Sequence, residues 1–311
     1  MSLTPVSTLD PPAGVDYAQV TTGPDAQPAS SMVGALMGLA GYFVVVPLVA
    51  QLVIALGWYA VGRPSTLASY TAEALRFEHP IGMFASHLAL ALLIPIAILV
   101  TRWIAGRHPK WLASVQPGVR WRYLLACFVI AAVVLNAVLL VGRIGTPWQP
   151  DPQANVWGWL LLVLLTSPFQ AAAEEVFFRG FLLQSFGALA RNRWAGVVAS
   201  ALIFALMHGT QNLPLFLDRL GFGLLAGWLV LRTGGLEAGI GCHVANNLFA
   251  FGWAAFFGGI ATARTTQVIG WGNAASDLFG FALFAAIAWW LAGRMNLATR
   301  TPGLESRASI G

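Results

Sequence analysis

Charged residues are scarce in this sequence of 311 residues. Lys, Arg, Asp and Glu make up 9% of the chain, whereas an average soluble domain has about 25%. Hydrophobic residues make up 58%, and the mean hydropathy is +0.72. So few charges cannot cover the surface of a soluble globule of this length, which excludes soluble enzymes, fibrous proteins and nucleic-acid binders. We therefore expect an all-α polytopic membrane protein.

Cysteine and the common protease motifs are also scarce or absent. The two cysteines, Cys127 and Cys242, lie inside apolar runs, so no disulfide framework is implied. None of the five histidines is followed by glutamate, which excludes the H-E-x-x-H zinc motif. No Gly-flanked serine lies within an apolar run, where a membrane serine protease would need its nucleophile.

About eight segments are apolar over nearly the 20 residues that a membrane-spanning helix needs. Residues 1–31 lack Lys, Arg and any apolar period, so we expect a disordered N-terminal tail. Residues 32–293 are expected to form the transmembrane domain and residues 294–311 a C-terminal tail. The glycines of Gly223-x-x-x-Gly227 should let their helix pack closely on a neighbour. The eight expected spans are Val33–Trp58, Ile81–Val100, Tyr123–Val141, Trp157–Leu183, Trp194–His208, Leu213–Leu231, Leu236–Phe257 and Ser276–Leu291.

Basic residues in the loops predict the orientation, because they are enriched on the cytoplasmic side of a membrane. With eight spans and the N-terminus inside, 11 basic residues face the cytoplasm and 5 face outward, leaving out Arg179 within a span. Both termini are then cytoplasmic. The inner set is Arg102, Arg107, Lys110, Arg120, Arg122, Arg191, Arg193, Arg232, Arg294, Arg300 and Arg307, and the outer set is Arg63, Arg76, Arg143, Arg219 and Arg264.

Polar side chains deep in a bilayer are costly and are therefore candidates for function. Glu174 and Glu175 are the only acidic residues well inside a predicted span. Glu175 and Arg179 are i,i+4 neighbours, so an ion pair would keep Glu175 ionised. Glu174 points about 100° away from Glu175 on the helix and has no cation at helical spacing. Such a carboxyl group suits proton transfer near neutral pH.

Two further polar groups follow on later spans. His208 ends a segment in which Phe204 lies one turn earlier, and the helix rise places His208 about 21 Å from the inner face. His243 and Asn247 lie on one face of a helix at i,i+4. Neutral imidazoles and an amide supply hydrogen-bond donors, which could form an oxyanion hole.

The motifs EExxxR, FxxxH and HxxxN, in this order on membrane helices, resemble the CPBP family of intramembrane proteases. That family includes the type II CAAX prenyl endopeptidases and the bacteriocin-processing and immunity (Abi-like) proteins. The resemblance covers a core of about residues 157–257. It implies that Glu174 activates a water with help from His208, that His243 and Asn247 stabilise the oxyanion, and that Glu175 and Arg179 are supporting residues.

We accordingly expect a glutamate-dependent intramembrane endopeptidase in the cell membrane, acting on a membrane-associated peptide or protein. Its partners would be this substrate and the lipid bilayer, with no nucleic acid. No cofactor is expected, although Glu174, His208 and His243 could form a His₂Glu zinc site as an alternative. Two other functions stay open: a non-catalytic immunity or scaffold protein of the same family, and a transporter with polar residues along its pathway.

The predicted orientation can be tested by cysteine labelling. After replacement of Cys127 and Cys242, cysteines introduced at Arg191 and Arg300 should react with a membrane-impermeant thiol reagent only once the inner face is opened. A cysteine introduced at Arg264 should react in intact cells. Labelling of Arg191→Cys from outside would overturn the orientation.

Overall fold

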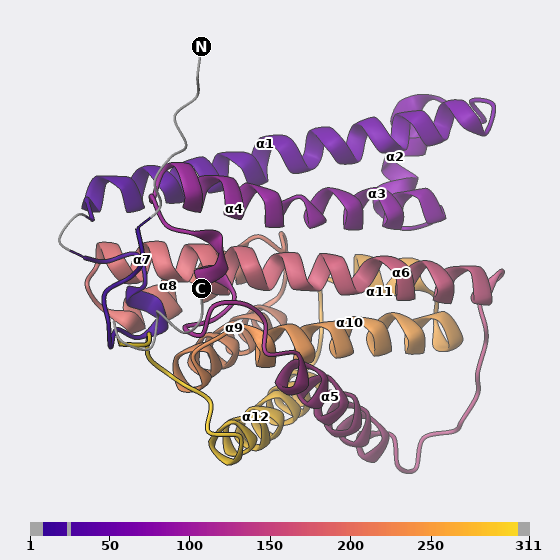
Figure 1. Ribbon diagram of the computed structural model, residues 1–311. Helices are drawn as coiled ribbons and strands as arrows, with labels where there is room; N and C mark the ends of the chain where they lie inside the picture. The colour runs from indigo at the N-terminus through magenta and orange to yellow at the C-terminus, as the bar shows by residue number, and fades with distance from the viewer. Residues whose placement is uncertain (1–8, 24–25, 304–311) are drawn as a thin grey trace.

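The computed structural model describes residues 9–23 and 26–303 of the chain (Figure 1). Helices account for 73% of the chain, and the described residues contain isolated β-bridges but no strand. The expected all-α class is therefore confirmed.

Each of the eight expected spans coincides with a helix or a continuous run of helices. Six runs are long and apolar enough to cross a membrane, namely α1, α3–α4, α5, α6–α7, α9 and α12. α8 has only 14 residues, and α10 has 21 residues but carries the polar residues of the HxxxN segment. The helices are α1 (Pro28–Ala60), α2 (Leu67–Leu75), α3 (Pro80–Ala91), α4 (Leu93–Trp103), α5 (Trp121–Gly142), α6 (Val156–Glu174), α7 (Leu183–Leu189), α8 (Arg193–Leu206), α9 (Leu213–Thr233), α10 (Glu237–Phe257), α11 (Ile260–Thr265) and α12 (Trp271–Arg294); η1 (Tyr17–Gln19) and η2 (Pro109–Leu112) are 3₁₀ turns, and η3 (Glu175–Leu182) is a π-helix.

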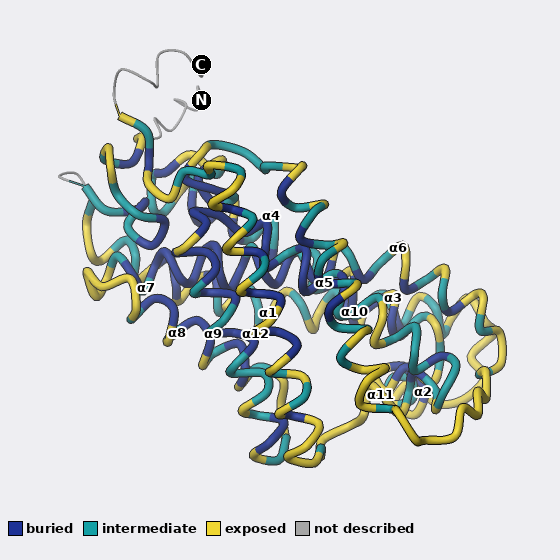
Figure 2. Tube along the Cα trace, turned by 90° about the horizontal axis from the view of Figure 1, so that it is seen from below, coloured by how far each residue is buried: buried dark blue, intermediate teal, exposed yellow. Residues whose placement is uncertain are grey.

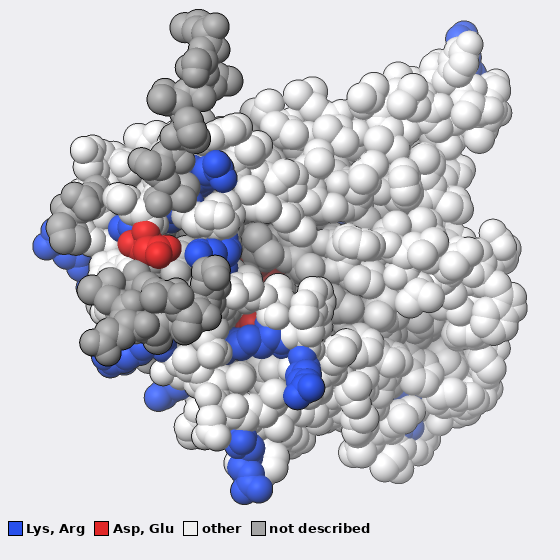
Figure 3. Space-filling model, viewed as in Figure 1, with Lys and Arg blue, Asp and Glu red and all other residues white. Residues whose placement is uncertain are grey.

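The outer surface of the helices is apolar (Figure 2). Along α1, Leu36, Phe43, Leu48 and Leu52 each expose more than half of their surface. An exposed apolar face of this extent marks contact with a membrane rather than with water. Lys and Arg gather, on the face seen in Figure 3, near the end of the molecule where the termini lie. The chain is a multi-pass membrane protein.

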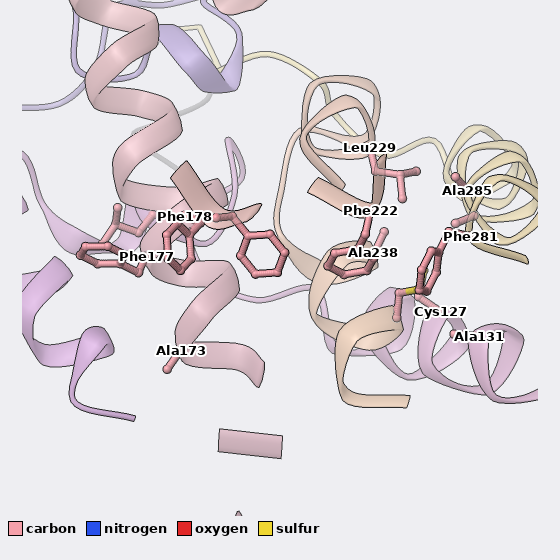
Figure 4. Packing of buried hydrophobic residues seen from close by; sticks show 14 of the residues in the cluster. Cys127, Ala131, Ala173, Phe177, Phe178, Phe222, Leu229, Ala238, Phe281 and Ala285 are labelled. Carbon is pink, nitrogen blue, oxygen red and sulfur yellow. The ribbon is translucent and has the colours of Figure 1, made fainter. Parts of the chain in front are cut away.

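α10 lies at the centre and packs against α5, α6 and α9. Small residues allow this close packing: a Cβ atom on Gly241 would lie 2.8 Å from the backbone nitrogen of Phe128 in α5. Figure 4 shows Cys127 of α5 beside Phe281 of α12, within the apolar core. Phe177 and Phe178 of η3 lie in the same core, with their ring centroids 5.2 Å apart. Among them, α6, η3 and α10 carry predicted site residues, and His208 follows α8.

The expectation of a disordered N-terminal tail is wrong for residues 9–23. Tyr17 and Ala18 have no exposed surface, and the Tyr17 hydroxyl donates a hydrogen bond to the carbonyl of Leu112. Arg107 donates to the carbonyl of Thr22 at 2.7 Å. The burial of Tyr17 and the hydrogen bond from Arg107 therefore hold this otherwise polar segment in place. α1 begins at Pro28, inside the predicted tail, whereas residues 1–8 lie outside the described residues.

The beginning of the expected C-terminal tail is packed as well. Thr301 is buried, its hydroxyl donates to the carbonyl of Pro12 at 2.6 Å, and it accepts a hydrogen bond from the backbone of Val15 at 3.1 Å. The two terminal segments therefore satisfy each other's backbone groups at one end of the bundle. Residues 304–311 of the predicted tail lie outside the described part of the chain.

The contact between α8 and α9 depends on the predicted glycine pair. A Cβ atom on Gly223 would lie 2.9 Å from the Cβ of Ala201, and one on Gly227 would lie 2.8 Å from Val197. Gly223→Val should therefore force the two helices apart and lower the free energy of unfolding by about 1–3 kcal/mol. Gly252→Val is the matched control, because nothing lies within 4 Å of a Cβ there. Thermal unfolding in detergent measures both, and equal stability of the two variants would contradict this account of the contact.

Candidate active site

A cavity of about 620 Å³ lies within the helix bundle. Glu174, His208, His243 and Asn247, the four residues predicted to carry the chemistry, all line it. They come from α6, the end of α8, and α10. Glu175 and Arg179 do not line the cavity and are fully buried behind its wall. The structure thus brings together the residues that the sequence places on three separate helices.

The cavity extends toward the end of the molecule opposite the termini. Phe77, which follows α2, and Arg264 of α11 are among its lining residues. Figure 2 shows α2 and α11 together at one end and both termini at the other. The depth of His208, about 21 Å, is counted from the side of the termini, whereas Phe77 and Arg264 line the cavity toward the other side.

Glu175 and Arg179 form an ion pair with no exposed surface. An Arg179 guanidinium N–H donates to Glu175 Oε1 at 3.1 Å, and both side chains are fully buried. The backbones of both helices that cover the ion pair approach it closely. A Cβ atom on Gly239 would lie 2.9 Å from Glu175 Oε2, and one on Gly223 would lie 3.2 Å from an Arg179 nitrogen. Glycines of α9 and α10 therefore leave the space that this pair occupies.

Aromatic rings cover the rest of the Arg179 guanidinium. Its central carbon lies 3.9 Å from the centroid of the Phe204 ring and 5.3 Å from that of Phe222. A ring face stabilises a cation by about 0.5–2 kcal/mol, and more when water is excluded. Phe204 thus connects the FxxxH segment physically to EExxxR, which explains why an aromatic residue suits this position.

His243 lies between the two glutamates. Its Nδ1 is 2.9 Å from Glu175 Oε1, and its Nε2 is 3.6 Å from Glu174 Oε2. When Glu175 is ionised it can only accept hydrogen bonds, so the Nδ1 of His243 carries a proton. The carboxylate behind the wall therefore orients the imidazole and leaves Nε2 facing Glu174 and the cavity.

His208 has a ring nitrogen available within the cavity. Its Nδ1 lies 2.8 Å from the carbonyl oxygen of Phe204. Because a carbonyl only accepts, Nδ1 carries the proton and Nε2 of the neutral ring keeps a lone pair. His208 makes no hydrogen bond to Glu174 in the described structure, and the two residues share the cavity without direct contact.

Gln170 is a polar residue of the site that the sequence did not predict. Its Oε1 accepts a hydrogen bond from Nδ2 of Asn247 at 2.9 Å. Gln170 is buried and lines the cavity. An apolar helix with polar residues at 170 and 174 places them one turn apart on one face, and this spacing was the signal available in the sequence.

The backbone at the site departs from regular α-helix. Residues Glu175–Leu182 form the π-helix η3, which begins directly after Glu174 and continues into α7. π-Helices are rare and occur frequently at functional sites. The wider turn starts at Glu175, whose side chain is fully buried, so the change of helical geometry falls between Glu174 and Glu175.

No three or more His, Cys, Asp and Glu side chains among the described residues are arranged to hold a metal ion. Glu175 engages Nδ1 of His243, and the carbonyl of Phe204 engages Nδ1 of His208, so Nε2 of each ring is the nitrogen left toward the cavity. Both the metal-free expectation and the zinc alternative stay predictions.

Comparison with known proteins finds a family similarity over the part of the chain that carries the site. Residues 156–249 match the family described as "Type II CAAX prenyl endopeptidase Rce1-like". This range contains Glu174, His208, His243 and Asn247, and it confirms the resemblance drawn from the three motifs. The description of that family names an endopeptidase.

One relative is a Bacillus subtilis (strain 168) protein described as "Uncharacterized protein YyaK". It is 29% identical over 187 residues, which cover 57% of this chain and 62% of that protein. The match thus spans less than two thirds of the relative's length. No solved structure matches the chain.

The burial of the Glu175–Arg179 pair gives a prediction about stability. Glu175→Gln should leave the Arg179 charge buried without a counter-charge, which costs about 3–5 kcal/mol. Glu78→Gln is the control, since the Glu78–Arg76 pair at 2.6 Å has side chains exposed by 42% and 48%, and exposed pairs contribute at most about 1 kcal/mol. Thermal unfolding of both purified variants measures the difference. Similar losses for the two would contradict a structural role for Glu175.

Proposed function

We propose that this protein is an intramembrane endopeptidase in which Glu174 activates water for hydrolysis of a peptide bond. The substrate is a membrane-associated peptide or protein segment. The convergence of Glu174, His208, His243 and Asn247 on one cavity is the observation that carries the proposal. The match to the Rce1-like family supports it independently.

The chemistry assigns each side chain a step. Glu174 takes a proton from a water that also donates a hydrogen bond to Nε2 of His208. The resulting hydroxide attacks the carbonyl carbon of the scissile bond, and its oxygen becomes an oxyanion. The C–N bond then breaks, and the proton held by Glu174 passes to the leaving amine. Water acts as the nucleophile throughout, so no covalent acyl intermediate forms.

Donors for the oxyanion come from α10. His243 presents Nε2 to the cavity while Glu175 holds Nδ1, and its Nε2 donates when the ring is doubly protonated. Asn247 uses one N–H for Gln170, which leaves its second N–H for the oxyanion. Removing one donor of this type lowers kcat by about 10²–10³-fold in enzymes of known mechanism.

The direction in which the cavity extends supports one side of the membrane as the side from which the substrate enters. The cavity extends to the end where α2 and α11 lie, opposite the termini. If both termini are cytoplasmic, as the basic residues predict, substrate enters from the outer side of the membrane. A secreted peptide or the tail of an exported membrane protein fits this geometry.

Replacing Glu174 tests the function directly. Glu174→Gln keeps the volume and removes the base, so cleavage should fall by at least about 10²-fold while the protein remains folded. Peptides from cells making wild-type protein or Glu174→Gln should therefore differ, with cleavage products missing from the variant. Asp151→Asn, at an exposed acid distant in sequence from the motifs, is the control and should keep the wild-type products.

The same experiment separates the rival functions. A non-catalytic immunity or scaffold protein would retain its biological effect as Glu174→Gln and yield no product difference. A transporter would instead show solute uptake in reconstituted vesicles. Identical peptide products from wild type and Glu174→Gln would refute the proposal.

A further inference from the structure

Two arginines in the cavity have no acidic partner among the described residues. Arg219 lies in the second turn of α9, and Arg264 lies in α11. Arg219 donates one hydrogen bond, to Gln211 Oε1 at 2.8 Å. The guanidinium of Arg264 lies over the Phe77 ring, 5.1 Å from its centroid. By contrast, Arg120 and Arg179, whose side chains are 12% and 0% exposed, each form an ion pair with a glutamate.

The position of these arginines is unusual for the charge pattern of the chain. They are two of the five basic residues predicted to lie on the sparsely charged outer side, and they are the two of those five that line the cavity. Orientation in the membrane does not require basic residues there. Because they line the same cavity as Glu174, we expect them to have a function in the site.

Both side chains line the cavity that also contains Glu174 and His208. Asp218 also lines the cavity but forms no ion pair with either arginine in the described structure, and its Oδ1 is buried without a hydrogen-bond partner. Several guanidinium N–H groups thus remain without protein acceptors in a partly enclosed space.

We propose that Arg219 and Arg264 form a carboxylate-binding subsite that selects substrates with an acidic group near the scissile bond. A guanidinium presents a planar fork of N–H donors that matches a carboxylate in a bidentate geometry. The carboxylate comes either from an Asp or Glu side chain or from the free C-terminus of the substrate. The subsite deepens the proposed function and rests on it, because it names the substrate class of the same cavity.

Peptide binding to the Glu174→Gln protein tests the subsite without requiring turnover. The probes are one apolar peptide in three matched forms: a C-terminal carboxylate, a C-terminal amide, and an amide with one internal Glu in place of Gln. We expect an acidic form to bind about tenfold more tightly than the neutral amide. The form that gains affinity identifies the source of the carboxylate.

Substitutions of the two arginines complete the test. In Arg219→Gln/Arg264→Gln, combined with Glu174→Gln, the preference for the acidic peptide should fall below about twofold. Arg63→Gln is the matched control, since Arg63 is also on the outer side but stacks on Tyr59 outside the cavity, and it should keep the preference. Size-exclusion profiles verify that each variant is folded.

The result that would overturn the carboxylate subsite differs from the result that would overturn the proposed hydrolysis. Equal binding of all three peptides to Glu174→Gln, or an acidic preference that survives in the double arginine variant, would overturn the subsite. Absence of cleavage products in wild-type cells would instead overturn the proposed hydrolysis, and it would leave the binding preference measurable.

Discussion

A full positive charge with no exposed surface lies at the centre of this protein, on Arg179. Moving an ion out of water costs several kcal/mol even after the surroundings relax, so the charge persists only because the surroundings compensate it. Glu175 supplies the counter-charge at 3.1 Å, and Phe204 supplies a ring face at 3.9 Å. Much of the local sequence is explained by this requirement.

The three motifs are parts of one physical network built around that charge. Glu175 bonds to Arg179 and to His243, and Phe204 covers Arg179 while its carbonyl fixes the tautomer of His208. Glu174, next to Glu175 in sequence, faces the cavity instead. The adjacent glutamates thus differ in position: Glu175 orients His243 from behind the cavity wall, and Glu174 faces the cavity.

Sequence reasoning located the helices and the four cavity residues because polar groups are conspicuous within apolar runs. It placed Glu174 and Glu175 in different roles from their helical phase, and their burial on opposite sides of the cavity wall agrees with this division. It did not identify Gln170, although the i,i+4 spacing to Glu174 was present in the sequence, because that spacing alone does not distinguish a site residue from a packing residue. It also mistook residues 9–23 for a disordered tail, since the order there depends on the pocket for Tyr17, which forms from distant segments.

The π-helix η3 changes which faces the residues of the helical run from Val156 to Leu189 present. Residues before Glu175 follow the α period, whereas Glu175–Leu182 follow a wider turn. A helical wheel drawn through the whole run from Val156 to Leu189 would therefore assign wrong faces to every residue beyond Glu174. The run has two phases joined at Glu174, so the lipid-facing stripe of α6 and the buried face of α7 are set independently, and removal of one residue from η3 would rotate one relative to the other.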